Sequence, residues 1–343
     1  MNHKSRNPGA LVIIGTIFLA TLFSPVRDAA AAGDLNIYYA DLATDPPQPP
    51  VAAATLTVDA QSLKLDVYRP SGSGPHGAVI LIHGGGFISG SKNDPAMVAL
   101  ARKIAHEGYV VFSVNYRMVN PAPSAHPELG SYPYPAPVLD TQIARRWIER
   151  HAGNFNLARS TDGQLLIASV GFSAGGTLAS LLGVNADPKT RVQAVVDYSG
   201  IMDFVGEEQG WRAKNASITD PAERSARPYW MTYWLPCTSI NPDSDCPGAD
   251  TSKEIDSWRR QLDLYQKVSA ARSDLTHTAP FLIIHGTNDT TVDFNRHALK
   301  MCNVLGARCF ALIRHRASHS LGGPKEYAAV VRFLQKEIQA KIP

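Results

Sequence analysis

The segment Gly171-Phe172-Ser173-Ala174-Gly175 places a serine between two glycines, after an apolar run and before a stretch with helical periodicity. In that context the serine sits on a sharp strand-to-helix turn that exposes its hydroxyl, and side chains at Gly171 or Gly175 would clash with the turn. A serine hydroxyl becomes a nucleophile near neutral pH only when a base takes its proton and an acid holds that base. Ser173 therefore predicts acyl-transfer chemistry, provided that the chain also supplies a histidine and a carboxylate.

Two later segments supply both groups. Asp289 comes just after the apolar run 281–285, and His319 follows the apolar run 308–313 through a polar turn. The chain order serine, acid, histidine is the order found in alternating α/β chains with this serine turn. We therefore expect Ser173 to be the nucleophile, Asp289 the acid and His319 the base.

Three nearby residues compete for these roles and have simpler interpretations. Asp293 begins the next helical stretch, where a carboxylate favours the helix N-terminus. His315 lies at the end of its apolar run and is expected to be a packed or surface imidazole. His285 precedes Asp289 by four residues, and we expect it to shape the turn that carries the acid.

Residues 78–90 form an apolar run followed by His83 and three successive glycines, Gly84, Gly85 and Gly86. Glycines let the backbone approach a substrate closely and direct its amides toward a developing oxyanion. A flexible glycine turn is the alternative, but it does not explain why the glycines follow a strand that would border the nucleophile strand. The spacing G-x-G-x-x-G with a downstream acid is missing, which argues against a dinucleotide-binding site.

Short apolar runs alternate with amphipathic stretches over most of the chain, and this alternation is typical of an α/β fold. The apolar runs are 78–82, 109–114, 165–170, 194–198, 281–285 and 308–313. The amphipathic stretches are 95–106, 138–151, 174–184, 293–305 and 325–340. Continuous Val, Ile and Leu runs between helices predict a mostly parallel central sheet with helices on both faces. The alternating stretches 55–59 and 63–69 predict an antiparallel edge hairpin before it.

Two segments interrupt this alternation. Residues 118–137 are crowded with prolines and are expected to form an ordered loop. Residues 203–278 contain no clear strand and are rich in tryptophan and tyrosine. A structureless loop of that length is uncommon, so we expect an inserted, helical, cap-like segment over one end of the sheet. Its aromatic residues either line a substrate pocket or pack into a small core of their own.

The combined motifs resemble the α/β-hydrolase carboxylesterases of the hormone-sensitive-lipase type and the neighbouring secreted carbohydrate-ester esterases. The motifs that carry the resemblance are His83-Gly84-Gly85-Gly86-Phe87, Gly171-Phe172-Ser173-Ala174-Gly175-Gly176, His285-Gly286-Thr287-Asn288-Asp289 and His319. Asn115-Tyr116-Arg117 and Tyr134-Pro135-Ala136, the latter leading into a helix with Asp140, are similar to the same family's pattern. The resemblance covers about residues 55–340, apart from 203–278.

The resemblance implies an α/β-hydrolase fold in which Ser173, Asp289 and His319 form a catalytic triad. It also implies an oxyanion hole made by the amides of Gly85, Gly86 and Ala174, with structural roles near the site for His83, Gly84, Gly171 and Gly175. His83 is implied to brace the oxyanion loop without transferring protons. Phe172 stands where the lipase-type branch usually has aspartate, so the resemblance leaves the substrate open.

The first 32 residues have the layout of a secretory signal peptide. Lys4 and Arg6 precede an apolar stretch of 14 residues, Ala10 to Phe23, and a run of alanines ends at Ala32. A single membrane anchor is the alternative, but a spanning helix needs about 20 apolar residues. We expect a signal peptide over 1–32, a catalytic domain over 33–343, a secreted or periplasmic location and no stable membrane anchor after cleavage.

Composition and cysteine content narrow the class of protein further. The chain of 343 residues is 44% hydrophobic with 33 basic and 30 acidic residues, which excludes disordered and fibrous classes. It has no basic stripe interleaved with aromatic residues, so a nucleic-acid partner is not expected. Four cysteines permit three disulfide connectivities, and we expect the one with two local pairs, Cys237–Cys246 and Cys302–Cys309. Free buried thiols are the alternative. Their spacing does not indicate a zinc site.

The sequence thus predicts a secreted serine carboxylic-ester hydrolase that forms an acyl-enzyme and acts on a small-molecule ester. The expected chemistry requires neither a metal nor an organic cofactor. An arylformamidase-like amide hydrolase with the same triad is one alternative. A catalytically inactive hydrolase fold used as a binding module is another, although all three triad members are present. Natural substrate and oligomeric state are left open.

Overall fold

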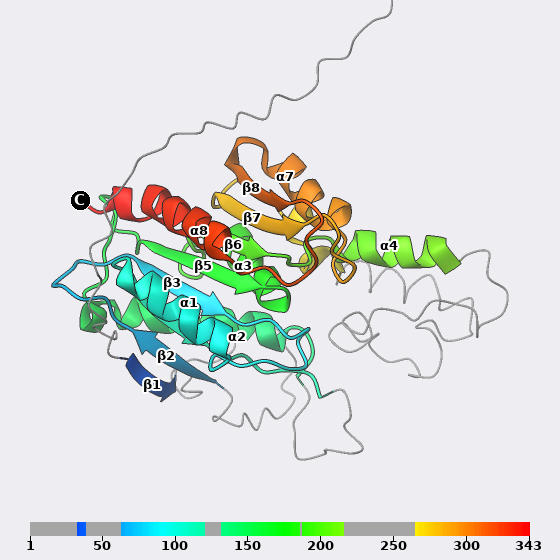
Figure 1. The fold of residues 1–343 in the computed structure, drawn as a ribbon. Helices are drawn as coiled ribbons and strands as arrows, with labels where there is room; N and C mark the ends of the chain where they lie inside the picture. The colour runs from blue at the N-terminus through cyan, green and yellow to red at the C-terminus, as the bar shows by residue number, and fades with distance from the viewer. Residues whose placement is uncertain (1–32, 39–62, 121–131, 186, 216–264) are drawn as a thin grey trace, which may run out of the picture. The chain divides into compact units, whose positions relative to one another are not determined.

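A computed structural model describes residues 33–38, 63–120, 132–185, 187–215 and 265–343, which all lie in one unit, Ala31–Pro343 (Figure 1). Its centre is an eight-stranded sheet in the order β1-β2-β4-β3-β5-β6-β7-β8. The strands are β1 (Gly33–Tyr38), β2 (Lys64–Tyr68), β3 (Ala78–Ile82), β4 (Val110–Val114), β5 (Ile167–Phe172), β6 (Ala194–Tyr198), β7 (Phe281–Gly286) and β8 (Cys309–Arg314).

Strands β4, β3, β5, β6, β7 and β8 run parallel to one another, while β2 pairs antiparallel with both β1 and β4. All residues of β3, β4 and β6 are buried, as their continuous apolar runs require when both faces of the sheet are covered. The predicted mostly parallel sheet is therefore confirmed. The outer partner of β2 is β1, at the start of the described chain, and residues 55–59 of the predicted edge hairpin lie outside the described residues.

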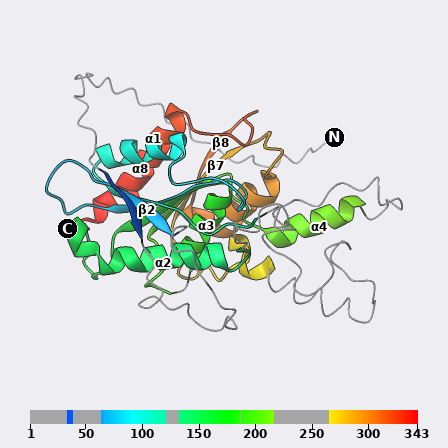
Figure 2. The ribbon, with the colours of Figure 1, turned by 90° about the horizontal axis from the view of Figure 1, so that it is seen from below.

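Helices cover both faces of this sheet, and each face has its own hydrophobic core (Figure 2). Side chains of α2 (Ala136–Arg150), α3 (Ala174–Val184) and α7 (Lys300–Leu305) contribute to one core. Side chains of α1 (Pro95–His106) and α8 (Pro324–Glu337) contribute to the other. The two layers hold the carboxyl ends of the parallel strands at one edge, and the loops that leave this edge carry the motifs.

The predicted interruptions are described only in part. Of the loop 118–137, residues 121–131 lie outside the described residues, and α2 already begins at Ala136. The predicted insertion 203–278 begins with α4 (Phe204–Asn215) and ends with the short 3₁₀ helix η3 (Ala270–Arg272), while residues 216–264 lie outside the description. Its two described ends are joined by an ion pair between Asp203 and Arg272.

Two further expectations touch this part of the chain. Cys302 and Cys309 form a disulfide that joins α7 to the start of β8, whereas Cys237 and Cys246 lie outside the described residues. Within the described ranges, no helix is both long and apolar enough to cross a bilayer.

Candidate active site

Ser173 occupies the turn between β5 and α3, with a positive φ of 51°. Non-glycine residues seldom adopt this conformation, and it marks a strained turn held by its surroundings. A Cβ atom at Gly171 would lie 2.0 Å from the carbonyl oxygen of Gly175, and one at Gly175 would lie 2.3 Å from the carbonyl oxygen of Ile82. Both glycines are therefore required so that the start of α3 can pack against β3 and β5.

The loops after β7 and β8 bring an acid and an imidazole to this serine. Nε2 of His319 lies 2.9 Å from Oγ of Ser173, and Nδ1 of His319 lies 2.7 Å from Oδ2 of Asp289. Since a carboxylate only accepts hydrogen bonds, Nδ1 carries the proton and Nε2 presents its lone pair to the serine hydroxyl. The structure thus brings together the three residues that the sequence analysis selected, separated by as many as 146 positions in the chain.

The carboxylate of Asp289 is surrounded by donors. Its Oδ1 accepts hydrogen bonds from the backbone amides of Thr291 and Val292, both at 2.9 Å, while Oδ2 faces the two histidines His285 and His319. Burial alone would raise the pKa of Asp289, but the hydrogen bonds from the histidines and from Val292 outweigh it and hold this pKa well below its usual range. The acid is therefore ionised at any pH at which the protein would work.

The glycine segment after β3 lies directly beside the nucleophile. A Cβ atom at Gly84 would lie 2.9 Å from the carbonyl oxygen of Phe172 and 3.4 Å from Cβ of Ser173. Gly85 and Gly86 have positive φ values of 105° and 60°, so the loop turns sharply at this point. Among the described residues, no acceptor is bound to the amides of Gly85, Gly86 or Ala174. These donors remain available for an oxyanion formed at Ser173.

His83 braces this loop, as the family resemblance implies. Its Nδ1 donates to the carbonyl oxygen of Gly84 at 2.8 Å, and its ring stacks on that of Tyr116 with centroids 4.3 Å apart. The Tyr116 hydroxyl in turn donates to the carbonyl oxygen of His83 at 3.1 Å. Burial lowers the pKa of His83 to about 4, so the imidazole is neutral and acts as a fixed hydrogen-bond donor.

Two buried ion pairs fix the backbone around the same loop. Lys92, near the loop's end, binds Oδ1 of Asp66 on β2 at 2.8 Å, and both side chains are almost fully buried. Arg117 binds the buried carboxylate of Asp140 on α2 through its side chain and its backbone amide. The first pair was missed by the sequence analysis, although an aspartate within a strand is a signal that could have indicated it.

Asp197 on β6 is a further residue that the sequence analysis missed. Its carboxylate is fully buried and accepts a hydrogen bond from the amide of Gly200 at 3.0 Å. A Cβ atom added at Gly176 would lie only 2.2 Å from Oδ1 of Asp197, so the carboxylate packs closely against the start of α3. Burial raises its pKa to about 7, although the charges of His285 and His319 work in the opposite direction. An aspartate inside the apolar run 194–198 was the sequence signal for this group.

The competing candidates occupy other environments. Oδ1 of Asp293 accepts the amide of Arg296 at 2.8 Å and caps the helical turn that follows, while His315 is exposed after β8. His285 is fully buried and contacts both the turn and Asp289, so its role is wider than the turn-shaping that the sequence predicts. Among the described residues, no group of three or more His, Cys, Asp or Glu side chains could hold a metal ion.

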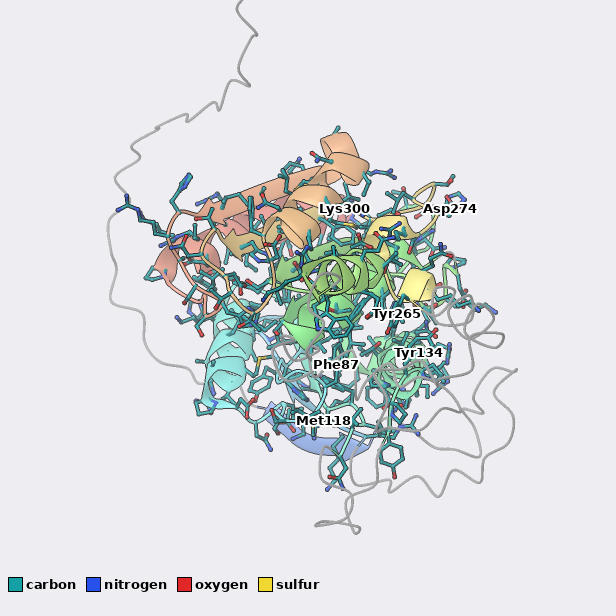
Figure 3. All side chains as sticks on the ribbon, turned by 90° about the vertical axis from the view of Figure 1, so that its right-hand side faces the viewer. Phe87, Met118, Tyr134, Tyr265, Asp274 and Lys300 are labelled. Carbon is teal, nitrogen blue, oxygen red and sulfur yellow. A yellow bond between two sulfur atoms is a disulfide. The ribbon has the colours of Figure 1, made fainter. Side chains whose placement is uncertain are left out.

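The side that carries these loops is shown in Figure 3, where Phe87, Met118, Tyr134 and Tyr265 are labelled. Phe87 and Tyr265 are fully buried members of the core on the α3 side of the sheet, and Met118 and Tyr134 pack against that core. These four aromatic or sulfur-containing side chains thus belong to, or pack against, the same core.

Two curated proteins of Mycobacterium tuberculosis are similar in sequence. Esterase LipC is 26% identical over 66% of this chain and 48% of its own length. Esterase LipI is 30% identical over 43% of this chain and 42% of its own length. The chain thus spans about half the length of these relatives.

Solved structures share the fold at low sequence identity. A truncated carbohydrate esterase from gut microbiota superposes with a TM-score of 0.61 and 18% identity, covering 92% of this chain and 99% of that one. Thermogutta terrifontis esterase 2, phosphonylated by sarin, gives a TM-score of 0.59 and 20% identity over 92% of this chain and 98% of its own. These likenesses establish an α/β-hydrolase fold.

A family model matches residues 65–244, which are 180 of the 343 residues and extend from β2 through the oxyanion loop and Ser173. Asp289 and His319 lie beyond the match, and the structure supplies their position. The chain belongs to the BD-FAE family.

Proposed function

We propose that the protein is a serine carboxylic-ester hydrolase that works through an acyl-enzyme on Ser173. The observation that carries this proposal is the position of His319 between Oγ of Ser173 at 2.9 Å and Oδ2 of Asp289 at 2.7 Å. Two similar mycobacterial proteins are named esterases, and solved structures with the same fold are described as esterases, which supports an ester as the substrate.

Acylation follows from the tautomer that the hydrogen bonds select. Nε2 of His319 takes the hydroxyl proton of Ser173 as Oγ attacks the ester carbonyl, and Asp289 stabilises the imidazolium that forms. The carbonyl oxygen becomes an oxyanion beside the amides of Gly85, Gly86 and Ala174. His319 then donates its Nε2 proton to the leaving alcohol, and the acyl group stays on Ser173.

Deacylation repeats these steps with water as the nucleophile. His319 takes a proton from water, the hydroxide attacks the acyl-enzyme, and Nε2 returns the proton to Oγ of Ser173 as the acid leaves. Each oxyanion donor is worth on the order of 10²–10³ in rate in enzymes of this kind. The proposed mechanism requires no redox step and uses only groups that the chain supplies.

A comparison of substrates tests the proposal and narrows the substrate class. We expect turnover of p-nitrophenyl esters, and a panel of acyl-chain, feruloyl and acetyl-sugar esters ranks the natural acyl and alcohol groups. The carbohydrate esterase among the structural neighbours makes the sugar esters the first to try. Matched amides in the same panel decide whether the activity extends to an amide hydrolase.

The serine itself is tested by Ser173→Ala, with Ser180→Ala on the helix that follows it, α3, as the matched control. Ser180 is buried, and its hydroxyl has no hydrogen-bond partner among the described residues, so its loss should leave turnover unchanged. Ser173→Ala should lower kcat by at least about 10³-fold and abolish labelling by a fluorophosphonate probe. Ester hydrolysis that survives in Ser173→Ala contradicts the proposal.

We also propose that the protein is exported, with residues 1–32 removed. The disulfide between Cys302 and Cys309 supports an oxidising compartment, because such bonds are rare where thiols are kept reduced. N-terminal sequencing of the protein recovered outside the cytoplasm should give a chain that starts near Gly33. A protein retained in the cytoplasm with its first residues intact contradicts export.

A further inference from the structure

His285 lies at the carboxyl end of β7, below the loop that carries the acid. Its side chain is fully buried, and its ring packs edge-on against Phe294, with centroids 5.9 Å apart. The proposed mechanism does not use this histidine. A buried imidazole is costly unless its polar atoms have partners, so its contacts indicate what it does.

One nitrogen of His285 faces two acceptors at once. Nε2 lies 2.9 Å from the carbonyl oxygen of Val292 and 3.3 Å from Oδ2 of Asp289. A backbone carbonyl only accepts hydrogen bonds, so Nε2 carries a proton and shares it between the two oxygens. Oδ2 of Asp289 therefore lies between two histidines, His285 on one side and His319 on the other.

We propose that His285 is a positioning residue for the hydrolysis reaction, and that its Nε2–H holds Oδ2 of Asp289 in line with Nδ1 of His319. This inference rests on the proposed function, because the orientation of the acid matters for catalysis only if Ser173 hydrolyses an ester. His285 does not touch the substrate in this role, and it acts through Asp289.

The two carboxylate oxygens of Asp289 have different partners, and this difference shows why a donor from His285 is needed. Oδ1 of Asp289 is held by the amides of Thr291 and Val292, which belong to the same turn. Among the described residues, Oδ2 would without His285 be held only by His319, the base that it has to orient. A donor from β7 fixes the carboxylate independently of the base, so that the acid can direct the imidazole toward Ser173.

The charges around His285 predict how its removal alters the pH dependence. The titratable groups that act on it are Asp289 and Asp197, and Asp197 lies on the same face of the sheet because it pairs in register with Ile283. Burial disfavours the protonated form, but the hydrogen bonds to Asp289 and Val292 and the two carboxylates raise the pKa of His285. The hydrogen bond from His285 thus partly neutralises the Asp289 carboxylate, which without it would stabilise the imidazolium of His319 more strongly.

His285→Phe and His285→Gln test the proposal in the full-length mature chain. Phenylalanine keeps the ring and its contact with Phe294 but has no donor, whereas glutamine keeps an N–H donor. A hydrogen bond to a charged group corresponds to about a tenfold to hundredfold effect, so His285→Phe should lower kcat by that factor at unchanged KM. The acid limb of kcat/KM should move to higher pH, and the NMR resonance of the Nδ1 proton of His319 should shift. His285→Gln should recover most of the kcat and the wild-type limb.

His315→Phe is the matched control, because it makes the same change at an exposed histidine after the neighbouring strand and should leave every readout unchanged. Circular dichroism and the midpoint of denaturant unfolding are compared with those of the wild type, which separates loss of fold from loss of position. A folded His285→Phe variant with wild-type kcat and pH profile overturns the inference. Absence of ester turnover and labelling in the wild type overturns the proposed function instead, so the two failures are distinguishable.

Discussion

Two His-Gly pairs at the ends of parallel strands have pKa values shifted in opposite directions. His83 follows β3 and His285 lies at the end of β7, and both side chains are buried. Burial lowers the pKa of His83 to about 4, while neighbouring carboxylates raise the pKa of His285. Each ring has one buried nitrogen without a partner among the described residues, Nε2 in His83 and Nδ1 in His285. The shared His-Gly sequence therefore does not determine the pKa of the histidine ring.

The difference follows from what each half of the site has to position. The His83 side aims backbone amides, and a neutral donor that holds a carbonyl oxygen is sufficient for that task. The His285 side fixes a carboxylate whose charge must reach His319, so donors to both of its oxygens are required. One half of the site depends on backbone conformation, and the other depends on charge.

Asp289→Asn should give the largest effect, because it removes the charge from the second half. An asparagine amide can donate to Nδ1 of His319 and so favours the wrong tautomer, and kcat should fall about 10³–10⁴-fold. Steady-state kinetics on a p-nitrophenyl ester measure this. Asp293→Asn is the matched control on the same loop, since asparagine can still accept the amide of Arg296. Comparable losses in both variants would mean that the charge of Asp289 is not specific to the site.

Gly85→Ala should give the next largest effect, through the backbone of the first half. A Cβ atom there would lie 2.0 Å from the carbonyl oxygen of Ser89 on a backbone with a φ of 105°, so the loop must move. Displacing one oxyanion donor lowers kcat by about 10²-fold. Gly72→Ala is the control, because its φ of 112° imposes similar strain with no atom within 4 Å. Equal kcat values for the two variants, measured on folded protein, would contradict a role for this loop.

The alternation of apolar and amphipathic stretches was enough to predict most of this fold. Residues 78–82, 95–106, 174–184 and 194–198 were expected as elements and occur as β3, α1, α3 and β6 with the same limits. Each is either buried on all sides or amphipathic with a clear period, so neighbours in sequence determine the pattern. β1 has no such signal, because its pairing with β2 depends on residues some 30 positions away.

The candidate site could be predicted in its motifs but not in its supports. Ser173, Asp289 and His319 were found because the turn chemistry around each is local. Asp197 and the bifurcated hydrogen bond of His285 depend on which strands are adjacent and which side chains share a face. A sequence shows that an aspartate is present in an apolar run, whereas the tertiary structure shows which groups it faces.

His83→Phe should have a smaller effect on turnover and sharpens the comparison with His285. Phenylalanine keeps the stack on Tyr116 but removes the donor to the carbonyl oxygen of Gly84. A neutral hydrogen bond corresponds to about a threefold to tenfold change in kcat. The acid limb of kcat/KM should stay at the wild-type pH, because a ring with a pKa of about 4 is almost entirely neutral above about pH 6. If the acid limb of kcat/KM moved to higher pH in His83→Phe, as expected for His285→Phe, the two histidines would act alike.

Asp197→Asn should have the smallest effect on turnover, within about threefold since the position touches no reacting group, and a clear effect on stability. Burial raises the pKa of Asp197 from an ordinary value of 3.8 to about 7 in the folded protein. The neutral carboxyl therefore contributes stability that is fully present below about pH 4 and is lost as the pH rises to about 7, because the unfolded chain releases the proton first.

Asparagine does not titrate and can keep the hydrogen bond from Gly200. Relative to wild type, the variant should gain on the order of 3 kcal/mol in free energy of unfolding between pH 4 and pH 7. Denaturant titrations at several pH values measure this difference, and a difference that does not change with pH would show that folding does not raise the pKa of Asp197.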